Sequence, residues 1–229
     1  MTTLTIVIPT LNEASCIESA LRALAPLRAR SQEVIVVDGG SEDGTAALAL
    51  PLADKVLSAS RGRAIQMNIG AREARGEVVL FLHADTRLPV DADRLVLNGL
   101  AASHLVWGRF DVRIAGRHRM LRIVGWAMNL RSRLTATCTG DQAIFVNREV
   151  LTRLGGYPPV ALMEDVALSK LLRRASRPLC VRTVATTSGR RWEARGVWRT
   201  MFLMWWLRLR YFFGTSPARL VQMYDDRRR

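Results

Sequence analysis

Short apolar runs alternate with amphipathic stretches through the first hundred residues. The runs predict four buried strands, at residues 4–8, 34–37, 55–57 and 78–82. Helical spacing and turn residues predict helices between them, at residues 13–28 with Asn12 as the cap, after a turn at 41–44, and at 64–74. Because strands and helices alternate, we predict an α/β fold with a mostly parallel central sheet and helices on both faces.

The second half has a less regular pattern, which predicts strands at residues 106–114 and 143–146 and helices at 117–134 and 164–174. A last segment, 198–213, places apolar side chains along one side at helical spacing: Trp198, Met201, Phe202, Trp205, Leu209 and Phe212. This stripe can dock on an anionic membrane, pack on the sheet or form a dimer interface. Packing in the core or in a dimer is favoured, because that is the usual fate of an apolar stripe.

The net charge of +14 is unevenly distributed. Residues 1–100 sum to −2, residues 101–172 to +5 and residues 173–229 to +11. This asymmetry indicates that the second half faces an anionic partner. A compositional bias is the alternative, because 32 of the 34 basic residues are arginine.

Length, cysteines and the N-terminal residues narrow the class of protein. A chain of 229 residues with 49% hydrophobic composition is long enough for one sizeable domain. Its three cysteines form no CxxC pair, which excludes a disulfide framework and zinc-ligand spacing. The start lacks the features of a signal peptide, and no stretch approaches the ~20 uncharged apolar residues of a spanning helix. We therefore expect a cytoplasmic protein.

Residues 79–89 carry the strongest chemical signal, because an apolar strand there runs into an acidic turn. Asp85 is expected at the carboxyl end of a buried strand, where open α/β sheets bind ligands. Its carboxylate suits Mg²⁺ or Mn²⁺, and such a cation can neutralise a diphosphate. His83 contacts a ribose or the metal, or else is a hydrogen-bonded strand end.

Polar groups also follow the first two strands. Pro9 ends the first strand and leaves Thr10 and Glu13 able to bond a base or ribose, although capping and helix-dipole roles are favoured for this loop by itself. Asp38 follows four apolar residues and needs a partner if it is buried. A base or ribose donor is one such partner, and an ordinary turn aspartate is the alternative.

Few acidic residues in the second half are available for proton transfer. Glu164 and Asp165 open a predicted helix, where carboxylates are also common for dipole reasons. Asp141 is the second choice.

Two basic clusters can contact phosphate. The first cluster combines two guanidinium groups with an aromatic stacking surface and comprises Arg190, Arg191 and Trp192. The second includes Arg63, which precedes a predicted helix whose N-terminus favours an anion.

Six segments carry a resemblance to a known family. In order they read PTLNE (9–13), VDGGSEDGT (37–45), GRAIQMNIGAREARGE (62–77), FLHADT (81–86), GDQAIFV (140–146) and GGYPPVALMEDV (155–166). Together they resemble the inverting family 2 glycosyltransferases of GT-A fold. They look closest to a compact, soluble bacterial subgroup with HADT and SGRRWE signatures, sometimes encoded beside arsenosugar-type clusters. The resemblance extends to about Tyr224.

The resemblance implies a single GT-A, Rossmann-like domain over residues 1–224. It comprises a nucleotide-sugar-binding half (1–100), an acceptor and catalytic half (101–190) and an amphipathic helical extension (191–224). A tail follows at 225–229, in which the three arginines 227–229 are expected to be disordered.

The resemblance also implies roles for the candidate residues. Asp85 holds the divalent metal, Mg²⁺ or Mn²⁺, and Asp165 is the catalytic base, with Glu164 and Asp141 as supporting groups or alternative bases. Arg190, Arg191 and Trp192 contact the diphosphate or the acceptor. The donor site comprises Pro9, Thr10, Glu13, Asp38, Arg63 and His83.

Two positions depart from the family pattern. Residues 83–85 read His-Ala-Asp in place of Asp-x-Asp. Arg191 and Trp192 resemble the end of the Gln-x-x-Arg-Trp motif of processive relatives, but Ser188 stands at the Gln position. That difference favours an enzyme that adds one sugar.

The implied reaction transfers a sugar from a nucleotide-sugar donor, UDP-linked in preference to GDP-linked, to a small-molecule or lipid-linked acceptor. We expect no nucleic-acid partner, while a homodimer and peripheral contact with the inner membrane face stay open. The alternatives are a basic module that binds nucleic acid or a membrane surface on a degenerate scaffold, and a nucleotidyltransferase.

Overall fold

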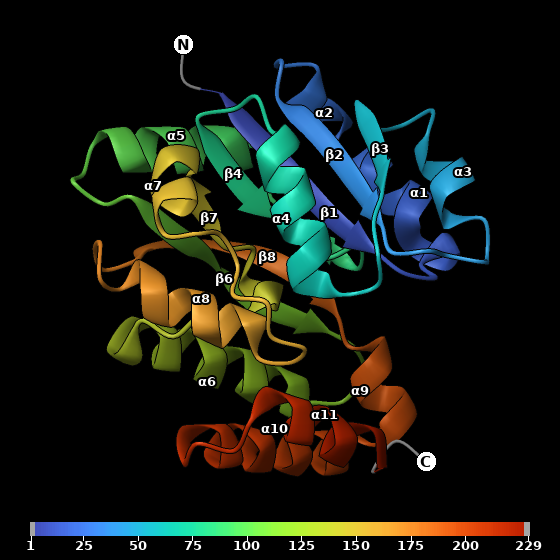
Figure 1. Ribbon diagram of the computed structural model, residues 1–229, viewed down its shortest axis with the longest axis vertical. Helices are drawn as coiled ribbons and strands as arrows, with labels where there is room; N and C mark the ends of the chain where they lie inside the picture. Colours follow the sequence, from blue (N-terminus) through green and yellow to red (C-terminus); the bar gives the residue numbers. More distant parts are fainter. Residues whose placement is uncertain (1–2, 227–229) are drawn as a thin grey trace.

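The computed structural model describes residues 3–226, and its central sheet has eight strands. Helices flank this sheet (Figure 1). The strand order is β3-β2-β1-β4-β7-β6-β8-β5. The strands are β1 (Leu4–Thr10), β2 (Glu33–Asp38), β3 (Lys55–Ser58), β4 (Val78–Phe81), β5 (Thr86–Arg87), β6 (Trp107–Ala115), β7 (Phe145–Asn147) and β8 (Leu179–Ser188). The helices are α1 (Ala14–Ala23), α2 (Ala25–Arg28), α3 (Thr45–Ala49), α4 (Arg63–Glu73), α5 (Ala92–Ala101), α6 (Met120–Thr135), the 3₁₀ turn η1 (Gly140–Gln142), α7 (Arg148–Arg153), α8 (Glu164–Leu172), α9 (Arg190–Arg195), α10 (Val197–Phe212) and α11 (Pro217–Asp226).

One half of the sheet is parallel and confirms the predicted alternation. β1 pairs in parallel with β2 and with β4, and β2 pairs with β3. Because successive side chains point to opposite faces, strands that are apolar throughout can be covered on both. One face packs against α1 and α5 through Leu21 and Val96, and the other against α4 and α8 through Met67 and Leu168. The carboxyl ends of β1, β2 and β4 therefore meet at one edge between two layers of helices.

The other half of the sheet is mixed. β7 runs antiparallel to β4 and β6, β8 runs parallel to β6, and β5 runs antiparallel to β8. The hydrophobic pattern does not predict β8. Residues 182–184 begin with two polar residues and interrupt the apolar run, and the structure shows all three exposed. β8 nevertheless matters for the site, since the pairing of Thr86 with Thr187 returns a distant segment to the loop after β4.

The first predicted helix needs two corrections. Residues 13–28 form two helices, because α1 ends at Ala23 and α2 begins at Ala25 with Pro26 in its first turn. Asn12 is not the cap. It has a left-handed φ of 54°, and its side-chain oxygen accepts a hydrogen bond from the Glu42 backbone N–H at 2.9 Å. Its side chain thus fastens the loop after β1 to the loop after β2.

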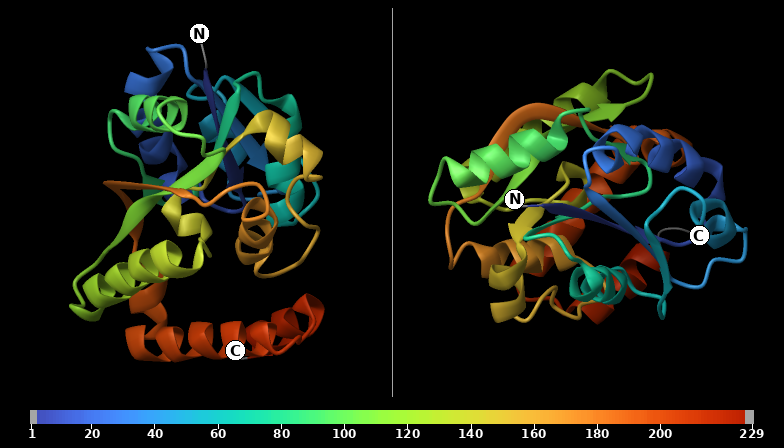
Figure 2. Two further views of the ribbon diagram at one scale, coloured as in Figure 1. Left: turned by 90° about the vertical axis from the view of Figure 1, so that its left-hand side faces the viewer. Right: turned by 90° about the horizontal axis from the view of Figure 1, so that it is seen from above.

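α10 and α11 form a layer at one end of the molecule, below α6 and α8 (Figures 1 and 2). The inner side of this layer contributes Leu207 and Leu220 to a cluster with Met163. The sequence predicts that the apolar stripe of 198–213 packs in the core or in a dimer. Packing in the core is wrong, since only Met201 among its six residues is buried, while the dimer stays a prediction. Among residues 3–226, no helix combines the length and apolar composition that a bilayer-spanning segment requires. The predicted disorder at 227–229 lies outside the described residues.

Gly70 provides a test of how closely α4 packs on the sheet. A Cβ at this position would lie 2.3 Å from Val7 Cγ1 and 3.1 Å from Val37 Cγ2. Alanine favours a helix by about 1 kcal/mol over glycine, but overpacking of a core costs about 1–3 kcal/mol. We expect Gly70→Ala to lower the free energy of unfolding, measured in urea. Arg72→Ala, on the exposed side of the same helix, is the control and should leave it almost unchanged.

Candidate functional site

Asp38 lies buried at the end of β2 and obtains its hydrogen bonds from the chain itself. The hydroxyls of Thr10 and Ser41 donate to Oδ1 at 3.1 and 2.5 Å. The backbone N–H groups of Gly40 and Ser41 donate to Oδ2 at 3.0 and 2.8 Å. The partner that a buried carboxylate requires is therefore supplied by the adjoining turn and strand.

Gln66, on α4, holds the ends of β1 and β2 together. Its Nε2 donates to the backbone carbonyls of Thr10 at 2.7 Å and Val37 at 2.8 Å. Gly39 leaves room for this amide, because the Cβ of any other residue at this position would lie only 3.0 Å from Nε2. Sequence patterns do not single out Gln66, because its two acceptors are backbone atoms of distant strands.

Asp85 lies in the loop after β4, and its backbone carbonyl accepts a hydrogen bond from the Ser188 N–H at 3.1 Å. Within residues 3–226, its half-buried carboxylate has no hydrogen bond or ion pair. The expected strand-end position is therefore correct, and the carboxylate is available for a ligand or a cation.

Glu13 is joined to the segment that follows β8. Its Oε1 accepts from Arg191 Nη2 at 2.5 Å, and its Oε2 lies 3.7 Å from Arg190 Nη2. Arg190 also donates to the Ser15 hydroxyl at 3.1 Å. Antiparallel pairing of β5 with β8 brings these arginines to the loop after β1. The structure thus gathers the predicted Arg190–Arg191 cluster and the loop of the first strand at one edge.

Cys16 lies beside Glu13 and donates a hydrogen bond from Sγ to Oε2 at 3.2 Å. Burial raises the pKa of the Cys16 thiol to about 12, and the Glu13 carboxylate adds to the effect. The thiol is therefore protonated at neutral pH.

Trp192 is placed differently from the two arginines that precede it. Its indole packs, half-buried, against a cluster that includes Leu121 and Val197. This contact anchors α9 to α6. Within the structure, Trp192 therefore has a packing role next to Arg190 and Arg191.

A chain of contacts links the loop after β4 to the start of α8. His83 Nδ1 lies 3.2 Å from Asp141 Oδ1. The next link is the Gly140 N–H, which donates to Asp165 Oδ2 at 2.9 Å, while the Val166 N–H donates to Oδ1 at 2.7 Å. η1 therefore connects His83, two residues before Asp85, to the candidate base Asp165.

The pKa of Asp141 is lowered from its ordinary value. Burial alone would raise it, but the hydrogen bond from His83 and the positive charges of Arg63 and Arg208 outweigh burial. Asp141 is thus held as a carboxylate among cationic side chains.

Glu164 is buried and pairs with Arg63, whose Nη1 donates to Oε1 at 3.0 Å. Burial acts to lower the pKa of Arg63, but the charge of Glu164, with Asp165 and Asp141, raises it above the ordinary value. Because Arg63 begins α4 and Glu164 begins α8, this ion pair ties the two halves of the domain together beside the site.

Two arginines that were not predicted as site residues, Arg131 and Arg208, also interact electrostatically with Asp165 and Asp141. Burial lowers the pKa of Arg131, on α6, to about 10, and repulsion from Arg208 contributes further. Burial also lowers the pKa of Arg208, on α10, while Asp165 and Asp141 act in the opposite direction. The Nε atoms of both arginines are buried without a hydrogen-bond partner. Since arginine is the common basic residue throughout the chain, no sequence signal distinguishes these two.

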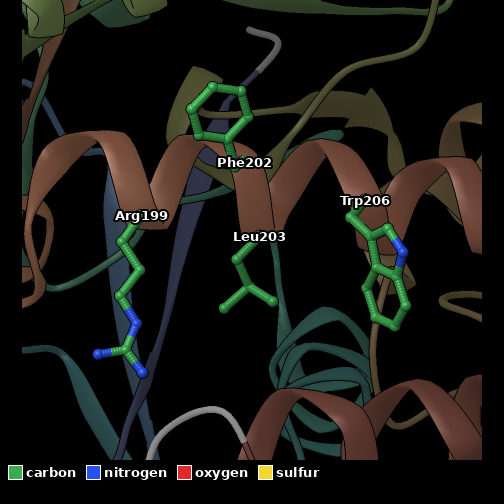
Figure 3. Close-up of a pocket in the computed structure, with 4 residues that line it drawn as sticks. All are labelled: Arg199, Phe202, Leu203 and Trp206. Atoms are coloured by element: carbon green, nitrogen blue, oxygen red, sulfur yellow. The ribbon is translucent and has the colours of Figure 1, made fainter.

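A surface groove also lies on α10. It has a volume of about 360 Å³ and is lined by Arg199, Phe202, Leu203 and Trp206. Figure 3 shows Arg199, Leu203 and Trp206 extending to one side of the helix and Phe202 to the other. This groove is separate from the strand ends that carry Asp38 and Asp85.

Comparison with known proteins shows the family. Residues 5–152 match the model of the family described as Glycosyl transferase family 2. The poly-beta-1,6-N-acetyl-D-glucosamine synthase of Staphylococcus aureus (strain COL) is 25% identical over 238 residues, which covers 93% of this chain and 57% of that protein. The chain thus spans little more than half the length of this curated relative.

Solved structures with the same fold include a mannosyltransferase and TarS. Mannosyltransferase PcManGT from Pyrobaculum calidifontis, in complex with GDP-Man and Mn²⁺, is 27% identical with a TM-score of 0.61, covering 81% of this chain and 56% of its own. S. aureus TarS 1-349, in complex with UDP-GlcNAc, has a TM-score of 0.67 at 17% identity, covering 81% of this chain and 58% of its own. These matches confirm the predicted single α/β domain.

Asp141→Asn tests the electrostatics at η1. A carboxyl group with a lowered folded-state pKa stabilises the protein above its unfolded pKa of about 3.9, and this contribution is lost as pH falls through the folded pKa. We expect the variant to lose about 1 kcal/mol or less at pH 7, because Asp141 is partly exposed, and to unfold less steeply with acid. Urea unfolding from about pH 7 to about pH 3 measures both effects. Glu42→Gln, at an exposed site, should retain the wild-type profile; an identical profile for Asp141→Asn would contradict the assignment.

Proposed function

Since the chain belongs to glycosyl transferase family 2, we propose that it transfers one sugar from a UDP-linked donor to an acceptor hydroxyl, with inversion at the anomeric carbon. The observation that carries this proposal is the unpaired Asp85 carboxylate. It lies at the parallel strand ends, next to a segment that supplies Arg190 and Arg191.

The donor nucleoside is proposed to bind across the loops after β1 and β2. Thr10 and Asp38 are held in fixed positions there. Gln66 donates a hydrogen bond to the Thr10 carbonyl, and Ser41 and Thr10 donate to Asp38. Glycine at position 40 has a φ of 85° and open space around its Cα, so a flat ring can approach the backbone. The remaining proposed donor residues are Pro9, Glu13, Arg63 and His83.

The base of the donor is proposed to be uracil. The name of the staphylococcal relative specifies N-acetyl-D-glucosamine, whereas the Pyrobaculum structure contains GDP-Man. The TarS structure contains UDP-GlcNAc, which supports uracil, and thermal shifts with UDP and GDP distinguish the two bases.

Asp85 suits a divalent cation that retains several water ligands and is also coordinated by phosphate oxygens of the substrate. No group of three or more His, Cys, Asp or Glu side chains in residues 3–226 is arranged to hold a metal by itself. Mg²⁺ is commonly bound by one or two carboxylates together with phosphate oxygens, and one free carboxylate meets that requirement. When bound, Mg²⁺ or Mn²⁺ would supply positive charge to the departing diphosphate.

Asp165 is proposed as the base because its carboxylate accepts only backbone N–H groups in the structure, from Gly140 and Val166. Glu164 pairs with Arg63, and Asp141 with His83, so both of these carboxylates already have a side-chain partner. Asp165 would accept the proton of the acceptor hydroxyl as that oxygen attacks the anomeric carbon.

The buried, unpartnered N–H groups of Arg131 and Arg208 support an anionic ligand on the acceptor side. A buried guanidinium N–H group without an acceptor is costly, and a phosphate or carboxylate would satisfy it.

Addition of one sugar is proposed because Ser188 replaces the motif glutamine and Trp192 packs against α6.

Asp85→Asn should abolish donor turnover and the metal-dependent rise in apparent melting temperature that donor binding produces. The fold should be unaffected, because the side chain makes no hydrogen bond or ion pair. Thermal shifts with UDP, GDP and their sugars, with and without Mn²⁺, measure binding, and detection of free nucleoside diphosphate measures turnover. Asp91→Asn, an equal charge change at an exposed helix start, should behave as wild type. Full metal-dependent turnover in Asp85→Asn would remove Asp85 from the site, and release of pyrophosphate would indicate nucleotidyl transfer instead.

Asp165→Asn should keep donor affinity and lose transfer by about 10²–10⁴-fold, the usual contribution of a general base. The amide retains one acceptor for a backbone N–H, so the local structure should persist. Calorimetry of donor binding and a transfer assay separate the two effects. Glu149→Gln, on the exposed side of α7, is the control. Loss of donor binding in Asp165→Asn, or transfer at the wild-type rate, would contradict the role.

A further inference from the structure

The outer side of α10 exposes a row of large apolar side chains. Trp198, Phe202, Trp205, Leu209 and Phe212 recur every three or four residues and are 50–82% exposed. Neighbouring rings contact one another: Trp198 stacks on Phe202 with centroids 6.4 Å apart, and Phe202 meets Trp205 edge-on at 6.4 Å. We call these five residues the α10 stripe. Such a continuous apolar patch marks an interaction surface.

The opposite side of α10 is already occupied. Leu207 is buried there and packs with Met163 and Leu220, while Met201, at the edge of the stripe, is also buried. α10 therefore cannot rotate to bury its stripe without exposing this cluster. The stripe must be covered from outside the described part of the domain.

Charge indicates what covers it. α10 carries three arginines and no acidic residue, and residues 173–229 hold 14 basic and 3 acidic side chains. A symmetric contact between two copies of α10 would bring these like charges together, because each copy presents the same surface. A bilayer with anionic lipids provides both a nonpolar interior for the rings and negative charge for the arginines.

A second helix has the same character. α6 exposes Ile123, Trp126, Leu130 and Leu134 at helical spacing, together with Arg122 and Arg133, and Arg119 is exposed just before the helix. It has no acidic residue, contacts α10, and lies at the same end of the molecule (Figures 1 and 2). Two neighbouring amphipathic helices of one charge sign are more typical of a membrane surface than of a single partner helix.

We propose that α10, assisted by α6, docks the protein on the surface of membranes that contain anionic phospholipids. The α10 stripe enters the region between headgroups and acyl chains, and the arginines contact lipid phosphates. α10 also carries Arg208, which interacts electrostatically with Asp165 and Asp141. Docking through α10 therefore places the bilayer on the acceptor side of the proposed site.

Sedimentation with vesicles tests the docking without any donor or acceptor. The full chain should sediment with phosphatidylcholine vesicles that contain about 30 mol% phosphatidylglycerol and much less with phosphatidylcholine alone, and high salt should reduce binding. The triple variant Phe202→Ser, Trp205→Ser, Phe212→Ser should lower the partition coefficient about tenfold or more, since the loss of each ring reduces the apolar area that the bilayer buries. Leu50→Ser with Val90→Ser, which removes two apolar side chains that are each 64% exposed elsewhere, is the control and should bind as wild type.

Equal binding to both vesicle types, or equal binding by the triple variant, would overturn the proposal. So would a wild-type chain that ignores vesicles but forms a dimer by light scattering that the triple variant loses, because the α10 stripe would then be covered by a second copy. Circular dichroism and urea unfolding confirm that each variant is folded. Since the assay contains no nucleotide sugar, its result is independent of whether sugar transfer is observed.

Discussion

The parallel pairing of β1 with β2 on one side and β4 on the other is the constraint on which the rest of the structure depends. It aligns three strand ends at one edge, where backbone donors and acceptors no longer pair across the sheet and polar side chains can gather. Gln66 and the Thr10–Asp38 hydrogen bond fix two of these ends. The third end carries Asp85, whose position depends on β4 remaining in register with β1.

Electrostatics determine which groups at this edge remain available. Buried charges are tolerated when they are paired, and most acidic groups here are: Glu13 with Arg191, Glu164 with Arg63, and Asp141 with His83. Each pair also joins segments far apart in the chain, so the ion pairs assemble the site as well as neutralise it. Among residues 3–226, the groups left at this edge are the Asp85 carboxylate, which has no hydrogen-bond partner, and Arg131 and Arg208, which have buried N–H groups without an acceptor. That combination suits a ligand that brings both negative charge and a cation.

The layer of α10 and α11 relates the site to its surroundings. One side of α10 completes the interior and places Arg208 opposite the acidic residues of η1 and α8, while the other side exposes aromatic rings. A single helix thus contributes to the acceptor side and to the outer surface. Any partner that covers the rings would also restrain Arg208, because both are on one rigid helix.

The sequence by itself determined the parallel half of the sheet and the positions of Asp38 and Asp85 at strand ends, because apolar runs and the turn residues after them are local signals. Tertiary structure alone decided which segments meet there. Pairing of β5 with β8 brings Arg191 to Glu13 across 178 residues, and packing of α6 and α10 brings Arg131 and Arg208 to the acidic groups. It also decided that the apolar stripe of α10 faces outward. Hydrophobic periodicity records that one side of a helix is apolar, but which side is buried depends on the contacts that the rest of the chain provides.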